Sequence, residues 1–115
     1  MALPTGSGSE LIKHFSKNDH DSAGYVTAID GVALHIYTVL SIICYNASGS
    51  ALTCTIAFND GSNDVVLVQQ SITGLGTFVF NDKFSFTGGT GVDLKLNTSG
   101  DAINWHVTYI DQNWV

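Results

Sequence analysis

VALHIYTVLSIICYN, residues 32–46, reads as a strand that is apolar on both faces. Side chains of a strand alternate between its faces, and a strand of a small antiparallel sheet normally exposes one face to water. The apolar residues of one face are Leu34, Ile36, Leu40, Ile42 and Cys44, and those of the other are Tyr37, Val39, Ile43 and Tyr45. We therefore expect this strand to lie between two packed layers, or to meet another chain with one face.

The rest of the chain predicts further short strands separated by turn residues. Residues 51–58 and 91–97 alternate between apolar and polar side chains, and 59–63 form a loop rich in Asn, Asp and Gly. Continued along the chain, this pattern gives about eight strands at roughly ten-residue spacing. The predicted fold class is all-β, a single antiparallel two-sheet β-sandwich with a jelly-roll-like topology.

The charge composition excludes several classes of partner. The 115 residues contain four Lys, no Arg and ten acidic residues, for a net charge of −6. Phosphate groups are usually held by Arg and Lys, so nucleic-acid binding is not expected. Charged residues make up only 12% of the chain, about half of the usual share. Such a surface is typical of a protein that is largely covered by its neighbours.

The N-terminal region predicts an extended arm that precedes the domain. MALPTGSGS, residues 1–9, has the Gly and Ser content of a flexible segment. ELIKHF, residues 10–15, is ambiguous between a strand and a helical turn, and the polar residues 16–22 are expected to form a loop. We therefore divide the chain into an arm, residues 1–15, and a β-sandwich domain, residues 16–115.

Two absences bear on localisation. The first ten residues lack the basic and apolar regions of a secretory signal. The apolar run 39–45 is too short to span a bilayer. We therefore expect synthesis in a cytoplasm and no membrane partner.

Cys44 and Cys54 flank the turn at residues 46–50 and share the apolar parity of their strands. A short hairpin loop would place them opposite each other on adjacent strands. We interpret them as buried, reduced thiols that pack as small apolar side chains, with a cross-strand disulfide as the alternative. Two cysteines alone are too few ligands for a Cys-based zinc site.

The histidines and acidic turns offer only weak candidate sites. His35 and His106 lie mid-strand, and we expect both to be structural. The neighbours in Asp19-His20-Asp21 alternate in direction on an extended chain, which disfavours chelation by that trio. Asp60-x-Ser62-x-Asp64 has the oxygen spacing of a calcium loop but lacks the later Glu, so a plain turn is favoured.

No catalytic constellation is present in the sequence. There is no Gly-x-Ser-x-Gly elbow, no glycine loop followed by a helix and Lys, and no carboxylate pair placed for glycoside hydrolysis. We therefore expect neither enzymatic activity nor a cofactor or metal. Trp114 follows a polar break at the chain end and is expected either to fold back or to dock on a neighbour.

Two longer stretches carry a resemblance to a known class of proteins. LSIICYNASGSALTCTIAFNDGSNDVVLVQQSI (40–72) and TFVFNDKFSFTGGTGVDLKLNTSGDAINWHVTYID (77–111) resemble small virion proteins of tailed bacteriophages. The resemblance covers residues 32–111, most of the chain, and lies in the pattern of strands and turns, including the two Phe-x-Phe segments. It implies a protein that decorates or cements an icosahedral capsid, often as a trimer, or a part of a tail fibre or its adaptor.

Together these observations predict a non-enzymatic capsid decoration protein that stabilises the major capsid shell as a homo-oligomer, most simply a trimer. Its expected place is the virion, on the capsid surface, after synthesis in the host bacterial cytoplasm. The candidate interface residues are Leu3, Leu11, Ile12, Phe15, Tyr37, Val39, Ile43, Tyr45 and Trp114. The alternative is a tail-fibre, adaptor or carbohydrate-binding module that uses the loops 59–64 and 81–83.

Overall fold

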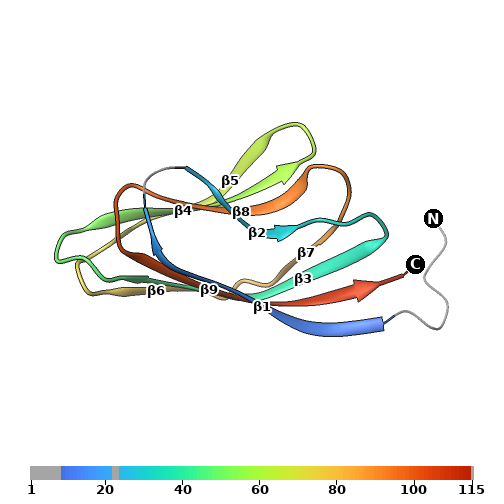
Figure 1. The fold of residues 1–115 in the computed structure, drawn as a ribbon, viewed down its shortest axis with the longest axis horizontal. Coiled ribbons are helices and arrows are strands. Elements are labelled where there is room, and N and C mark those ends of the chain that lie inside the picture. Colours follow the sequence, from blue (N-terminus) through green and yellow to red (C-terminus); the bar gives the residue numbers. More distant parts are fainter. Residues whose placement is uncertain (1–8, 22–23, 115) are drawn as a thin grey trace.

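A computed structural model describes residues 9–21 and 24–114, and every regular element in these ranges is a β-strand. The strands are β1 (Ser9–His20), β2 (Val26–Asp30), β3 (His35–Asn46), β4 (Leu52–Asp60), β5 (Asp64–Ile72), β6 (Thr77–Phe80), β7 (Phe84–Thr87), β8 (Val92–Thr98) and β9 (Ile103–Asn113). They form two antiparallel layers (Figure 1). The described part of the chain contains no helix with the length and apolar character that a membrane crossing needs.

The strand order is that of a jelly roll. Sheet A has the order β1-β9-β3-β6, with β7 also on β3, and sheet B has the order β2-β8-β4-β5. The chain passes repeatedly between the two layers, so each sheet is built from strands that are distant in sequence. The predicted all-β sandwich with jelly-roll-like topology is confirmed.

The core lies between the sheets and contains mainly Ile, Val and Leu. Its fully buried side chains come from both layers and include Ile29, Val39, Ile42, Ile56, Leu94, Leu96, Ile103 and Val107. Four phenylalanines of β6 and β7 pack partly buried against them. The alternation seen in 91–97 and 103–109 therefore places one face of β8 and of β9 in the core.

A β-bulge at Leu40 explains why β3 reads as apolar on both faces. β3 pairs with β9 as Val39↔Tyr109 and then Ser41↔Thr108, so Leu40 is an extra residue. The inward side chains are Tyr37 and Val39 before the bulge and Ile42 and Cys44 after it. One core-facing row thus changes parity halfway along the strand. The expectation of two separate apolar faces is correspondingly wrong for the first half of β3.

The other neighbour of β3 is interrupted at the same level. β7 pairs with residues 36–39 and β6 with residues 42–45, and Asn81-Asp82-Lys83 connect the two short strands. This three-residue excursion lies beside the bulge. β6 and β7 together therefore act as one edge strand of sheet A with a polar interruption at its centre.

The predicted arm is largely part of sheet A. β1 pairs with β9 from Ser9↔Asn113 to Lys17↔Trp105, and after a register shift His20 lies opposite Ile103. Residues 9–15 are thus an edge strand, and the loop expected at 16–22 is strand as far as His20. Polar side chains suit an edge strand because much of it faces water. Residues 1–8 of the predicted arm lie outside the described residues.

The turn after β3 crosses between the sheets and is not a hairpin. β3 belongs to sheet A and β4 to sheet B, so Cys44 and Cys54 lie on opposite layers, both fully buried free thiols. Buried Asn46 holds the crossover, because its amide donates to the carbonyls of Ser50 and Ile72 at 2.8 and 3.1 Å. A hydrogen bond from Cys44 to Cys54, together with burial, raises the pKa of Cys44.

Candidate self-association face

The outer face of sheet A is a continuous surface made by alternate residues of its strands. Ile12 of β1 lies opposite Ile110 of β9, which in turn lies opposite Thr38 of β3. Further along, Ile43 of β3 lies between His106 of β9 and Val79 of β6. Cross-strand neighbours of this kind pack side by side, so the face carries two apolar pairs, Ile12 with Ile110 and Ile43 with Val79, among uncharged polar residues.

This face is almost free of charge. Its outward residues are Glu10, Ile12, His14, Ser16, Ile36, Thr38, Ser41, Ile43, Tyr45, Thr77, Val79, Ser85, Thr87, Asn104, His106, Thr108, Ile110 and Gln112. Glu10 is the only Asp, Glu, Lys or Arg among them. The outer face of sheet B, in contrast, carries Asp64, Asp93 and Lys95, with 3.4 Å between Lys95 Nζ and Asp64 Oδ1.

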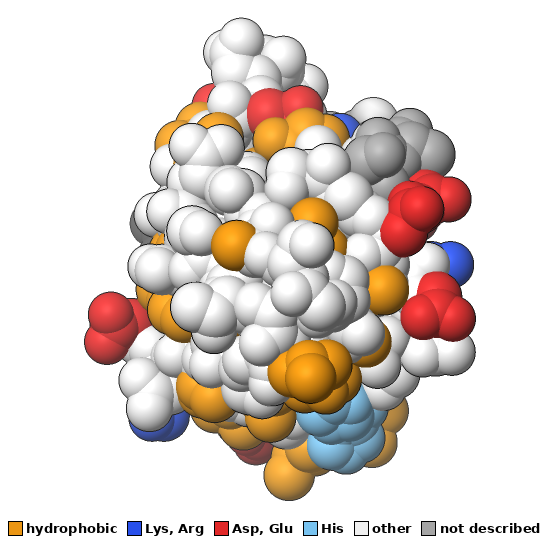
Figure 2. All heavy atoms as spheres, turned by 90° about the vertical axis from the view of Figure 1, so that its left-hand side faces the viewer, with side chains coloured by type: hydrophobic (Ala, Val, Ile, Leu, Met, Phe, Trp, Pro, Cys, Tyr) orange, Lys and Arg blue, Asp and Glu red, His pale blue; other side chains and the backbone are white. Residues whose placement is uncertain are grey.

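Several of the outward apolar side chains are well exposed. Ile12, Val79 and Ile43 keep 67%, 49% and 37% of their surface accessible. Figure 2 shows hydrophobic and histidine side chains together along its lower border, where sheet A lies. Exposed apolar patches on a protein of this size usually mark a contact surface. We call this surface the association face.

The structure divides the predicted interface residues. Ile12, Ile43 and Tyr45 lie on the association face. Tyr37 and Val39 do not, because they are 3% and 1% exposed and belong to the chain's own core. Their assignment to an interface is wrong, and the cause is the change of parity at Leu40.

Leu11 and Phe15 lie away from this face. Leu11 is exposed but points to the opposite side of β1 from Ile12, and Phe15 packs partly buried against the core. Trp114 is half-buried, and its backbone N–H donates to the Leu34 carbonyl at 3.0 Å, which continues the pairing of β9 with β3. Leu3 lies outside the described residues.

The sequence prediction omits three apolar residues of the association face, and two of them, Val79 and Ile110, are instructive, the third being Ile36. Val79 lies between Phe78 and Phe80, and Ile110 follows the inward row of β9 with opposite parity. Their position on the outward side of the strand could have identified them, since an apolar residue on the solvent-facing side of a half-buried strand is unusual. It was overlooked because both stand beside stronger core patterns.

A buried carboxylate joins three strands at the other end of sheet A. Asp111 of β9 accepts hydrogen bonds from Lys13 Nζ at 2.8 Å and from His35 Nδ1 at 2.7 Å. Burial acts to raise the pKa of Asp111, but the hydrogen bonds and charges of Lys13 and His35 outweigh it and lower that pKa. His35 is therefore a structural residue, as expected.

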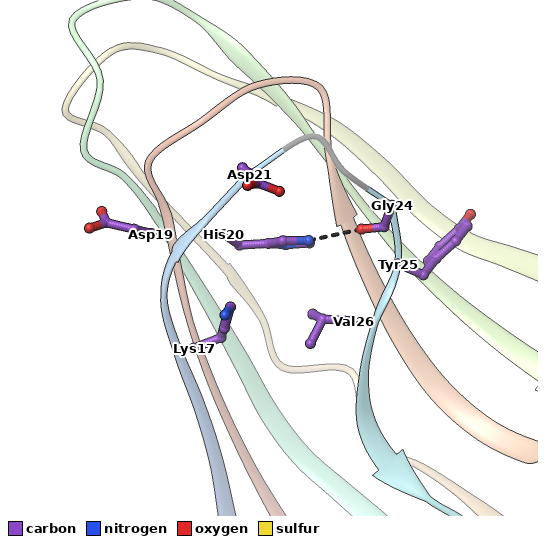
Figure 3. Close-up of a pocket in the computed structure, with 7 residues that line it drawn as sticks. All are labelled: Lys17, Asp19, His20, Asp21, Gly24, Tyr25 and Val26. Atoms are coloured by element: carbon purple, nitrogen blue, oxygen red, sulfur yellow. Dashed lines mark hydrogen bonds between the residues drawn. The ribbon is translucent and has the colours of Figure 1, made fainter.

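A shallow pocket of about 220 Å³ lies where β1 leads into β2 (Figure 3), lined by Lys17, Asp19, His20, Asp21, Gly24, Tyr25 and Val26. Asp19 points away from His20, whose ring reaches toward the carbonyl of Gly24 at 2.9 Å. Neighbouring side chains of the trio thus diverge. In the described ranges, no three or more His, Cys, Asp or Glu are grouped to hold a metal ion.

The Asp60 loop is a turn stabilised by its own side chains. Asp60 Oδ1 accepts backbone N–H groups of Asn63 and Ser62 at 2.8 and 2.9 Å, and these bonds lower the pKa of Asp60. Asp64 accepts from the Asn59 amide and pairs with Lys95. Both carboxylates thus accept hydrogen bonds from residues of the turn, in agreement with the plain-turn interpretation.

The comparisons with known proteins give the fold but no family. No family model and no curated protein sequence matches the chain. One similar solved structure is a Bacillus protein of the disulfide-linked pili that form endospore appendages. It is 10% identical, with a TM-score of 0.57, over 100% of this chain and 97% of that one.

Another is the protein of the virus-like particle of extra small virus from the giant freshwater prawn Macrobrachium rosenbergii. It is 10% identical, with a TM-score of 0.53, over 98% of this chain and 84% of that one. A chain of infectious bursal disease virus is more distant, with a TM-score of 0.46 at 9% identity, over 93% of this chain and 32% of that one. The chain therefore shares the β-sandwich of viral capsid and pilus proteins.

Proposed function

We propose that this chain is a non-enzymatic structural subunit that assembles with copies of itself through the association face. The observation that carries the proposal is the almost uncharged outer face of sheet A, on which the apolar side chains of Ile12, Ile43 and Val79 are exposed. Covering such area stabilises a contact by about 25 cal/mol per Å² before the costs of association. The occurrence of the fold in capsid and pilus proteins agrees with a structural role.

The specific role that we propose is decoration of a tailed-phage capsid. The resemblance of residues 32–111 to small phage virion proteins supports it. In this proposal a homotrimer sits on the capsid surface and bridges copies of the major capsid protein, after synthesis in the bacterial cytoplasm. Residues 1–8, with Leu3, and the exposed Leu11 would contact the shell.

The pilus protein of similar structure does not suggest disulfide-linked assembly for this chain. Its pili are disulfide-linked, whereas the two cysteines of this chain are both fully buried in the core. The proposed assembly therefore includes no disulfide between copies. The proposed assembly depends on packing of the association face.

The proposal is tested in two steps. Sedimentation velocity of the full chain over a range of concentrations should show an oligomer that dissociates on dilution; a monomer at every concentration contradicts it. Deletion of residues 1–8 should leave the fold intact and abolish binding to capsids that lack the protein. Deletion to residue 15 is unsuitable, because it would remove more than half of β1.

A carbohydrate-binding module is the second candidate, and the pocket of Figure 3 is the observation that favours it. Tyr25 is 40% exposed and lines this pocket on the side opposite Lys17 and Asp21, and sugars are commonly held by an aromatic face together with polar groups. Binding on a glycan array that Tyr25→Ala abolishes would favour this function. The copy number per virion also separates the two, because a decoration protein is far more abundant than a tail-tip protein.

A further inference from the structure

Two histidines form a pair on the association face. The rings of His14 and His106 have centroids 5.3 Å apart and an angle of 23° between their planes. Thr108 lies opposite His14 and Ser16 opposite His106, so the two histidines are diagonal neighbours on β1 and β9. His106 also lies opposite Ile43 on β3. The pair thus borders the apolar side chain of Ile43 on this face.

Each ring is oriented through its Nδ1 atom. Ser16 Oγ is 2.8 Å from His106 Nδ1, and Thr108 Oγ1 is 3.4 Å from His14 Nδ1. In the tautomer whose Nδ1–H donates to the hydroxyl oxygen, the lone pair is on Nε2, which is the usual arrangement of metal-binding histidines. Within residues 9–21 and 24–114, no hydrogen bond engages Nε2 of either ring.

We propose that His14 and His106 bind a divalent transition-metal ion such as zinc, and that histidines of a second copy complete its coordination. Neutral imidazole is a preferred zinc ligand, and with Zn–N bonds of about 2.0–2.1 Å two imidazoles on one tetrahedral ion have centroids about 5 Å apart. The observed separation is close to that value, and the two stacked rings would turn about their Cβ–Cγ bonds to direct both Nε2 lone pairs at one ion. The inference rests on the proposed self-association, because one chain supplies only these two ligands.

The other histidines are engaged elsewhere. Both ring nitrogens of His20 are hydrogen-bonded, to Trp105 and Gly24, and Nδ1 of His35 is bonded to Asp111. The sequence contains four histidines in all. Substitution of His14 or His106 should therefore reduce any zinc binding that depends on imidazole.

The experiment uses the full chain after treatment with EDTA. Equilibrium dialysis against zinc measures uptake, and sedimentation velocity with and without zinc measures association. We expect less than one zinc per chain, because copies share the ion, and stronger association in zinc. His14→Phe and His106→Phe keep a flat ring without the nitrogen, and each should weaken zinc binding at least about tenfold. Ser16→Ala removes an orienting partner but no ligand and should weaken it less.

The outcomes separate this inference from the proposed function. Association in EDTA with no zinc uptake, or zinc uptake that both Phe variants retain, overturns the metal site and leaves self-association standing. Binding of one zinc per chain by a protein that stays monomeric overturns both the shared site and self-association. Loss of association in EDTA by the Phe variants would assign the histidines to packing and overturn their role as ligands.

Discussion

The indole Nε1 of Trp105 donates a 2.9 Å hydrogen bond to Nδ1 of His20, and both side chains are buried. Because Nδ1 is the acceptor, the proton of this imidazole is on Nε2, which donates to the Gly24 carbonyl at 2.9 Å. The Trp105 bond ties the last residue of β1 to β9 within sheet A, and the Gly24 bond ties it to the segment that leads into β2. His20 therefore anchors the connection from sheet A to sheet B at this end of the sandwich.

We expect His20→Phe to lower the free energy of unfolding by about 1–3 kcal/mol, because it leaves the buried N–H of Trp105 without an acceptor. Urea denaturation followed by circular dichroism measures the change. Trp105→Phe made in the His20→Phe background supplies the control, since the bond is already absent there. Strictly additive effects of the two substitutions would show that the bond does not couple these residues.

Replacing Ile43 by Asp should break the self-association while the fold is retained. The substitution places a charge in the middle of the association face, and its effect should be at least tenfold on the association constant, about 1.4 kcal/mol. Val66→Asp is the matched control, because Val66 is 54% exposed and lies on the outer side of sheet B. Sedimentation velocity compares the two. Equal association of both variants would place the contact elsewhere.

The thermal stability of the wild type should depend on its concentration and not on reductant. If copies cover the association face, raising the concentration raises the melting temperature by mass action. Cys44 and Cys54 are free thiols, so dithiothreitol should leave the melting curve unchanged. Differential scanning calorimetry at several concentrations, with and without the reductant, tests both. A fall of the melting temperature in reductant would reveal a disulfide.

Cys54→Ser should destabilise the subunit without altering its assembly. The side chain is fully buried, and burial of the more polar hydroxyl there should cost about 1–3 kcal/mol. The free energy of unfolding reports the first effect and the association constant the second. Because the pKa of Cys44 is raised, that thiol should also resist iodoacetamide in the native state. Rapid labelling of the folded protein would contradict its burial.

Stability should fall at both pH extremes through the Asp111 cluster. The folded pKa of Asp111 is lowered, so its contribution is present above the unfolded pKa of about 3.9 and is lost as the pH falls further. Hydrogen bonding to Asp111 raises the pKa of Lys13. That contribution is present below about pH 10.4 and is lost as the pH rises through the raised value.

Asp111→Asn isolates these effects. At neutral pH it should lower the free energy of unfolding by about 1–2 kcal/mol, since Lys13 is partly exposed and the pair is screened. The difference from the wild type should shrink below pH 4, where the carboxylate becomes protonated. A difference that stays constant down to pH 2 would show that the charge of Asp111 is not what stabilises the cluster.

Most strands could be predicted from the sequence, whereas the edge strand β1 and the irregularities between strands could not. Alternating apolar residues in β4, β8 and β9 marked each strand and its inward face. The bulge at Leu40 left no local signal, because its neighbours on both parities are apolar and only the pairing with β9 places the extra residue. The turn at 46–50 has hairpin chemistry, yet packing of the core carries the chain into the other sheet.

The association face could be predicted only in part. Ile43 and Tyr45 were identified from the unusual apolar character of β3, but Tyr37 and Val39 were assigned with them before the change of parity was known. The sequence places Ile12 in an arm, because the polar residues that follow it in this edge strand read as a loop. The lack of charge on the association face depends on the strand registers, because its residues come from strands that are distant in sequence.

The interruption at Asn81-Asp82-Lys83 affects how subunits could pair edge to edge. An open ladder of subunits needs two complementary free edges on each sheet, one to receive a strand and one to offer it. In sheet A the β6–β7 edge is broken by exposed polar and charged residues, so only β1 presents a long free edge. Pairing along β1 alone would end after two copies. Sheet A is thereby protected from fibril formation by repeated edge pairing.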